Sequence, residues 1–129
     1  MDQIAAAEFA NIIGRFYQTL ATRVGDTLHQ QIGTISKDQA SVLMGDQSRL
    51  ISYSNTFFSL SDKIAFEGAD VYFKKVQDAT DEITEAVKHI EKVDKIITIS
   101  ANTIMLAGGI VSANPSMIMG ALTQLKSAI

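Results

Sequence analysis

Residues 96–125 read IITISANTIMLAGGIVSANPSMIMGALTQL, and this stretch decides how the chain can fold. Lys95 precedes it and Lys126 follows it, and no charged residue lies between them. Asparagine is a good N-cap and proline suits the first position of a helix, so Asn114-Pro115 marks the start of a new helix. The stretch therefore predicts an apolar helical hairpin whose second helix runs from residue 115 to about residue 127.

The apolar hairpin suits three environments. A helix that is apolar on several faces lies in the centre of a bundle or in a membrane, and residues 96–113 are near the lower limit for a membrane span, roughly 17–20 residues. Asn102 and the Gly108-Gly109 pair weaken the segment as a lone span. We therefore expect a hairpin in the protein core, a switchable hairpin that inserts into lipid, or a face for a partner helix. The residues expected to make these contacts are Ile96, Ile97, Ile99, Ile104, Leu106, Ile110, Val111, Met117, Ile118 and Leu122.

Helical spacing continues upstream of the hairpin. Apolar residues recur every three or four positions in the first segment, which is typical of one long amphipathic helix. Gly33 offers a C-terminal stop, and Ser36-Lys37-Asp38-Gln39 has the form of a capping box for the next helix. The first stripe consists of Phe9, Ile13, Phe16, Leu20, Val24, Leu28 and Ile32.

The predicted second helix begins after the capping box and carries a heptad seam. Its end is expected within residues 57–70, FFSLSDKIAFEGAD, where Ser59 or Ser61 offers a cap and Gly68 a kink or a stop. The residues of the seam are Leu43, Leu50 and Phe57, with Ile51 and Phe58 beside them.

The third segment has the most regular spacing, and its dense charges are expected to face solvent. An unbroken helix over residues 68–107 would be about 60 Å long, more than the width of a compact globule of this size. We therefore predict an all-α fold, in which residues 1–129 form one domain. It is expected to be an elongated bundle of about four helices with heptad-like seams and the C-terminal hairpin. The seam of the third segment is Tyr72, Val76, Ala79, Ile83, Val87, Ile90, Val93 and Ile97.

Composition narrows the classes of function. The chain has 129 residues, 47% of them hydrophobic, and a net charge of −3 without a basic patch, so we expect no nucleic-acid partner. The absence of cysteine excludes disulfides, thiolate metal sites and a cysteine nucleophile. The first residues, MDQIAAAEFANIIGRF, have no basic leader followed by a small-residue cleavage site, so we expect them to belong to the fold. These features fit a cytoplasmic protein or one exported without a cleaved signal peptide.

No pattern of catalytic residues stands out. A di-iron bundle needs two Glu-x-x-His motifs, whereas the chain has one acid-x-x-His run, ending at His29, and Glu85 precedes His89 by four residues. The stretch MGDQSRL, residues 44–50, lacks the strand of a nucleophile elbow and is expected inside a helix or at a bend. We therefore predict no catalytic, cofactor-binding or metal-binding residue. His89 is the candidate pH sensor, because the acids around it favour its charged form.

The run EITEAVKHIEKVDKIITISANTIMLAGGIVSANP, residues 82–115, places a heptad-rich helix before an uncharged hairpin. In this arrangement, residues 61–125 resemble α-helical pore-forming toxins and related secreted translocators of bacteria. The chain is shorter than typical members of that class, and it offers no family motif from which a residue could be carried over. The resemblance implies a bacterial protein linked to a toxin or secretion system.

The expected function is non-enzymatic. We expect protein–protein interaction or assembly, in which an exposed helical face or the apolar hairpin docks on a partner or on a second copy. The alternative is a membrane-active protein that inserts residues 96–125 into lipid. The heptad seams do not separate an intramolecular bundle from a coiled coil between chains, because both use the same spacing.

Overall fold

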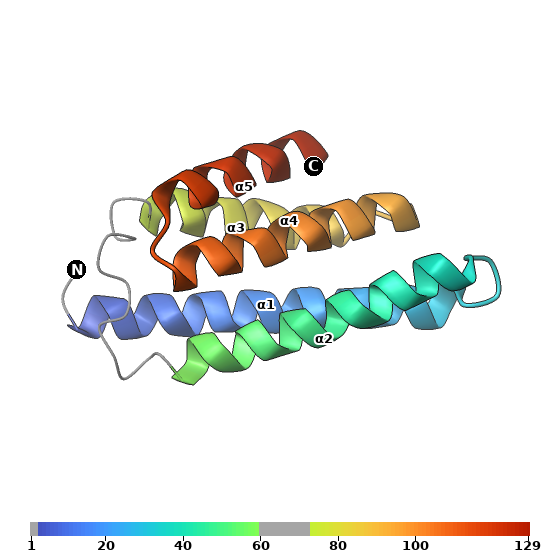
Figure 1. The fold of residues 1–129 in the computed structure, drawn as a ribbon, viewed down its shortest axis with the longest axis horizontal. Helices are drawn as coiled ribbons and strands as arrows, with labels where there is room; N and C mark the ends of the chain where they lie inside the picture. The colour runs from blue at the N-terminus through green and yellow to red at the C-terminus, as the bar shows by residue number, and fades with distance from the viewer. Residues whose placement is uncertain (1–2, 60–72) are drawn as a thin grey trace.

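Every regular element of the described structure is an α-helix. The computed structural model describes residues 3–59 and 73–129, and its helices run along the long axis of the molecule (Figure 1). The predicted all-α class is confirmed, but these two ranges hold five helices where about four were expected. The helices are α1 (Gln3–Gln31), α2 (Lys37–Ser59), α3 (Phe73–Val87), α4 (Val93–Val111) and α5 (Pro115–Ala128).

The turn between α1 and α2 follows the predicted signals. Gly33 lies in this turn, between the end of α1 and the start of α2. Ser36 Oγ accepts a hydrogen bond from the Gln39 N–H at 3.0 Å, and Gln39 Oε1 accepts one from the Ser36 N–H at 3.0 Å. The capping box is therefore confirmed, and it satisfies backbone groups that a helix start leaves unpaired. From this cap α2 runs back along α1 (Figure 1).

The core lies around α1, which packs against α2, α3 and α4. The stripe predicted for α1 is buried from Phe9 to Val24, and Leu28 is partly buried. The prediction for Ile32 is wrong: its side chain is 68% exposed, because α1 ends at Gln31, one residue before it. The seam predicted for α2 is confirmed, and its fully buried residues are Leu43, Leu50 and Phe57.

The single helix predicted over residues 68–107 is wrong, because two helices occupy this part of the chain. α3 ends at Val87, α4 begins at Val93, and the two run in opposite directions (Figure 1). The Arg23 guanidinium of α1 donates from Nε to the Val87 carbonyl at 2.8 Å and from Nη2 to the Ile90 carbonyl at 2.6 Å. The first bond satisfies a carbonyl group that the end of α3 leaves unpaired, and the second holds the loop that follows α3. A contact from another helix thus holds a reversal in a stretch that has no glycine or proline.

α3 buries the seam predicted for it from Val76 to Val87, and its charged residues from Asp78 onward are exposed.

The predicted break after α2 is only partly visible. α2 ends at Ser59, and the rest of that prediction lies outside the described residues. The predicted positions that fall there are Ser61, Gly68 and Tyr72.

The turn between α4 and α5 is closed by backbone and side-chain hydrogen bonds. Ala113 has a φ of 51°, in the left-handed region. The Ala113 N–H donates to the Ile110 carbonyl at 3.1 Å and the Asn114 N–H to the Gly109 carbonyl at 2.9 Å, which is the Schellman motif of a helix end. Asn114 Oδ1 accepts from the Met117 N–H at 3.1 Å, so the predicted cap of α5 is confirmed.

The glycine pair of α4 has a packing role. α4 continues through Gly108 and Gly109 as a regular helix. A Cβ atom at Gly109 would lie 3.0 Å from the Ile118 backbone nitrogen and 3.1 Å from Ile118 Cγ1. Gly109 is therefore what lets α5 approach α4 so closely.

Candidate interaction surfaces

The residues predicted for the hairpin divide between core and surface. α4 and α5 pack against each other, and α4 also packs against α2 and α1. Ile97 and Ile104 are partly buried, whereas the side chains of Val111 and Met117 are 46% and 39% exposed. Most of these residues thus belong to the core of this structure, and a contact surface can use only the outward ones. The buried residues are Ile96, Ile99, Leu106, Ile110, Ile118 and Leu122.

The outward side of α4 and the start of α5 form an uncharged surface. Ala101 and Met105 of α4 are exposed, Met105 to 45%. A Cβ atom at Gly108 would lie 3.7 Å from the Met117 sulfur of α5 and 3.8 Å from the Tyr53 hydroxyl of α2, so three helices meet there. We call these five residues the α4–α5 surface. Charge is absent from α4 beyond its first turn and from α5 before its last turn.

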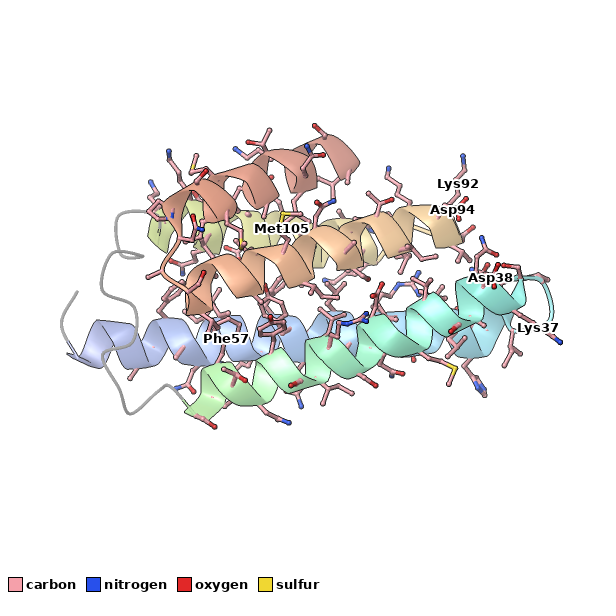
Figure 2. The ribbon with its side chains drawn as sticks, viewed as in Figure 1. Lys37, Asp38, Phe57, Lys92, Asp94 and Met105 are labelled. Atoms are coloured by element: carbon pink, nitrogen blue, oxygen red, sulfur yellow. The ribbon has the colours of Figure 1, made fainter. Side chains whose placement is uncertain are left out.

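A group of charged residues lies away from this surface, at the end of the molecule where α2 and α4 begin. Figure 2 shows Asp38, Lys92 and Asp94 at that end, and Met105 at a distance from them. Gln39 Nε2 of α2 donates to Asp94 Oδ1 of α4 at 2.9 Å, which ties the two helix starts together. The charged end and the α4–α5 surface are therefore separate parts of the molecule.

A buried hydrogen bond fixes α4 to α1. The Tyr17 hydroxyl, fully buried, donates to the Thr103 carbonyl oxygen at 2.6 Å. The Tyr17 ring centroid lies 5.3 Å from that of Phe57 and 6.3 Å from that of Tyr53. Burial raises the pKa of the Tyr17 phenol well above its usual range, and Tyr53 acts in the same direction, so the hydroxyl keeps its proton. α4 thus contacts an aromatic cluster of α1 and α2, and Tyr53 of this cluster also belongs to the α4–α5 surface.

Asp46 of α2 is a buried carboxyl group, 5% exposed. Its Oδ1 lies 3.3 Å from Nη1 of Arg49, whose side chain is 63% exposed. Its Oδ2 accepts no hydrogen bond from the part of the chain that the structure describes. Desolvation raises the pKa of Asp46, and the Arg49 guanidinium opposes this shift without cancelling it. Asp46 therefore makes the stability of the fold depend on pH.

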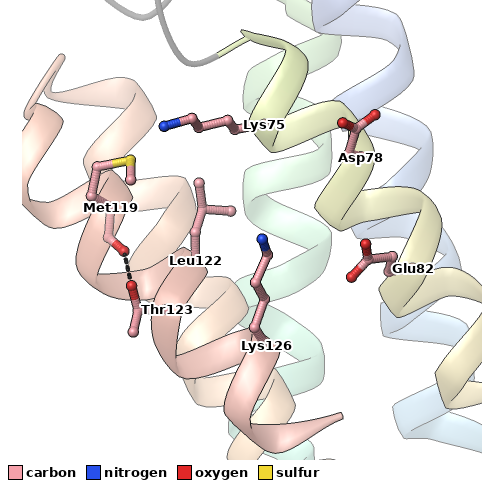
Figure 3. A pocket seen from close by; sticks show the side chains of 7 residues that line it. All are labelled: Lys75, Asp78, Glu82, Met119, Leu122, Thr123 and Lys126. Carbon is pink, nitrogen blue, oxygen red and sulfur yellow. Dashed lines mark hydrogen bonds between the residues drawn. The ribbon is translucent and has the colours of Figure 1, made fainter.

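A groove of about 220 Å³ lies between α3 and α5 (Figure 3). Among the described residues, none of its lysines lies within 4.0 Å of a carboxylate oxygen. Two cationic and two anionic side chains balance there, so the groove selects neither an anion nor a cation. Its lining residues are Lys75, Asp78, Glu82, Met119, Leu122, Thr123 and Lys126.

The histidines are not part of a metal-ligand set. Over residues 3–59 and 73–129, no three His, Cys, Asp or Glu side chains are grouped so as to hold a metal ion. His29 is exposed in the last turn of α1, and His89 Nε2 lies 3.7 Å from Glu85 Oε1. The pKa of Glu85 is lowered first by its hydrogen bond from Lys88, at 3.1 Å. The pH-sensor role of His89 stays a prediction.

Sequence reasoning did not single out Arg23 or Asp46, although their spacing carried a signal. Arg23 follows Phe16 by seven residues, which puts it on the buried face of α1. Asp46 lies three residues after Leu43 and four before Leu50, which puts it on the seam of α2. A charged residue at a seam position marks a group that needs a specific partner.

One helix in the described residues, α4, is long and apolar enough to cross a membrane, and half of it is buried in the protein. The central helix of a bundle passes the same test. Comparison with protein-family models, with curated proteins and with solved structures finds no match for this chain.

Proposed function

We propose that the protein acts without catalysis, by binding another protein through the α4–α5 surface. The observation that carries this proposal is Met105, a large apolar side chain that is 45% exposed within the uncharged part of α4. A solvent-facing helix side usually carries charged residues, as α3 does here. Contiguous exposed apolar surface marks a site of interaction, and Met117, 39% exposed, lies near Gly108, which follows Met105 by three residues on α4.

The chemistry of the surface suits an amphipathic helix of a partner. Methionine side chains adapt to different shapes, and Met105 and Met117 flank Gly108, which carries no side chain of its own. Tyr53 adds an aromatic ring with a hydroxyl group, a combination that is enriched in binding hot spots. The resemblance to secreted helical translocators supports a bacterial toxin or secretion system as the setting.

Site-specific photocrosslinking in the cells that make the protein tests this proposal. A photoreactive residue at position 101 or 105 is expected to capture one discrete protein, whereas the same residue at position 81, exposed on α3, captures none. Met117→Lys should suppress the crosslink from position 105 and leave the melting temperature unchanged. Equal amounts of crosslinked product from positions 81 and 105, or no crosslinked product from positions 101 and 105, would argue against partner binding through the α4–α5 surface.

Insertion into lipid is the second candidate function, favoured by the length and apolar composition of α4. The uncharged turn between α4 and α5 would enter the bilayer first, together with Val111, the last residue of α4, which is 46% exposed. Insertion would have to break the bond between Tyr17 and Thr103, because that bond holds α4 in the core. Lipid entry is therefore expected to be promoted by Tyr17→Phe.

Vesicle experiments separate this candidate from protein binding. If lipid is the target, the protein co-sediments with vesicles and releases an enclosed dye. Val111→Asp should abolish both effects while folding is kept, since a charge at the turn opposes entry into hydrocarbon. Ser41→Asp, at an exposed position of α2, is the matched control. Absence of binding by the native protein and by Tyr17→Phe would exclude the membrane candidate.

A further inference from the structure

α2 carries two parallel heptad stripes of apolar residues, and one of them is buried in the core of the protein. Leu50 belongs to the buried stripe, whereas Ile51, the next residue, is 47% exposed. Met44, seven residues before Ile51, is 57% exposed. Residues seven apart share one face of a helix, so Met44 and Ile51 form a second apolar stripe beside the seam. A helix with two such stripes normally packs against neighbours on both.

Ile51 of the second stripe lines a groove of about 280 Å³ between α1 and α2. At one end of the stripe, Phe58 packs over Gly14 of α1, where a Cβ atom would meet the Phe58 ring at 2.7 Å. Further along, Ile51 stands at the edge of the open groove. The residues that line the groove are Gln18, Ala21 and Thr22 of α1, and Gln47, Ile51, Ser54 and Asn55 of α2.

The groove has no charged residue in its lining. Arg49 is the exposed charge of α2 beyond its first turn, and it lies about 160° around the helix from Ile51 at 100° per residue. A two-fold interface brings each surface patch against the same patch of a second copy, so charges near its centre meet charges of their own sign. An uncharged centre avoids that repulsion, and the exposed charges Arg15 and Asp26 of α1 lie outside the lining of the groove.

The size of this face also fits a dimer. α2 has 23 residues and is about 35 Å long, and two adjacent helices present a strip about 20 Å wide. Such a strip offers roughly 700 Å² per copy, near the value of about 800 Å² per partner that is typical of specific interfaces. α1 is longer than α2 and supports the whole strip.

We infer that a second copy of this chain packs on the outer face of α1 and α2, with the two pairs of helices related by a two-fold axis. The Ile51 side chain of each copy lies against the groove of the other, and Met44 lies towards the edge. The interface is distinct from the α4–α5 surface and does not depend on the function proposed for that surface.

Sedimentation equilibrium of the full chain over a wide concentration range tests the dimer. Ile51→Lys is expected to raise the dissociation constant roughly 100-fold or more, because it places a charge at the centre of the interface. Met105→Lys, an equally exposed position on α4, is the matched control and should leave the dimer intact. Circular dichroism shows whether each variant folds, and Met44→Lys replaces Ile51→Lys if that variant does not.

Cysteine crosslinking locates the interface independently, since the native chain has no cysteine. Asn55→Cys is expected to give a covalent dimer with a short bismaleimide, whereas Asp81→Cys on α3 gives none. A protein that is monomeric at every concentration overturns the inference, as does a dimer that survives both lysine variants. If Asn55→Cys instead crosslinks a different protein in cells, the face belongs to that partner and the dimer is wrong.

Discussion

The Tyr17 hydroxyl of α1 lies 2.6 Å from the Thr103 carbonyl oxygen of α4, and this buried hydrogen bond joins positions 86 residues apart. Loss of the hydroxyl removes the bond but keeps the ring. Tyr17→Phe should therefore lower the free energy of unfolding by about 1 kcal/mol, the usual net value of such a bond. Urea unfolding measures the change. Tyr53→Phe, on a partly buried ring, serves as control, and an equal loss in both variants would contradict a specific role for Tyr17.

Arg23 is expected to determine whether the chain reverses after α3. Arg23→Ala removes the hydrogen bonds to the Val87 and Ile90 carbonyls and should destabilise the fold by about 2 kcal/mol. The amides of residues 88–92 should also exchange hydrogen faster, because the reversal loses its anchor. Arg15→Ala, exposed on the same helix, provides the comparison. Unchanged exchange in Arg23→Ala would show that the reversal forms without the guanidinium.

Asp46 gives the protein a defined pH dependence. The pKa of Asp46 is raised in the folded state from its ordinary value of 3.8, mainly by desolvation. The native state thus holds a proton that the unfolded state has released, and stability falls as pH rises through the raised pKa. Asp46→Asn should be more stable than the native protein above that pKa, and it should flatten the profile between pH 3.8 and that pKa. Arg49→Ala should steepen it, because the opposing charge is lost.

Denaturation at a series of pH values checks this prediction. The difference between native protein and Asp46→Asn should shrink as the pH falls towards 3.8, where the carboxyl group protonates in both states. An Asp46→Asn variant that is less stable than the native protein at neutral pH would instead mean that the Arg49 pair outweighs desolvation.

Ala113 is a position where glycine should stabilise the protein. Its φ of 51° is unfavourable for a residue with a Cβ atom. Ala113→Gly should raise the free energy of unfolding by about 0.5–1 kcal/mol after the entropy of the unfolded glycine is counted. Thermal or urea unfolding measures this change in the free energy of unfolding. Gly109→Ala should act in the opposite direction, because its Cβ would meet Ile118 at 3.0 Å.

Local signals were enough to predict several boundaries of the helices. The capping box at Ser36 and Gln39 and the cap at Asn114 are made by residues three apart in sequence, so they could be read from the chain. The reversal after Val87 could not, because its anchor Arg23 lies 64 residues away. The all-α class followed from spacing alone, whereas the reversal that separates α3 from α4 involves that distant contact.

The candidate surfaces were predictable to a lesser degree. The uncharged stretch after Lys95 indicated where an unusual surface would lie, but its spacing could not separate Leu106, which is buried, from Met105, which is exposed. That division depends on which side of α4 meets α2, α5 and α1. The heptad seam identified Leu50 as a core residue, but whether Ile51 beside it is covered depends on how α1 packs against α2.

The two most extensive helix pairs, α1 with α2 and α4 with α5, join neighbours in the chain. Short loops close at a low entropic cost, so these pairs are expected to form early during folding. Docking of one pair on the other then comes late, and the contact between Tyr17 and Thr103 belongs to that last step. Tyr17→Phe should accordingly speed unfolding and leave the refolding rate almost unchanged. The contact between Tyr17 and Thr103 therefore determines how long the native state lasts and has little effect on how fast it forms.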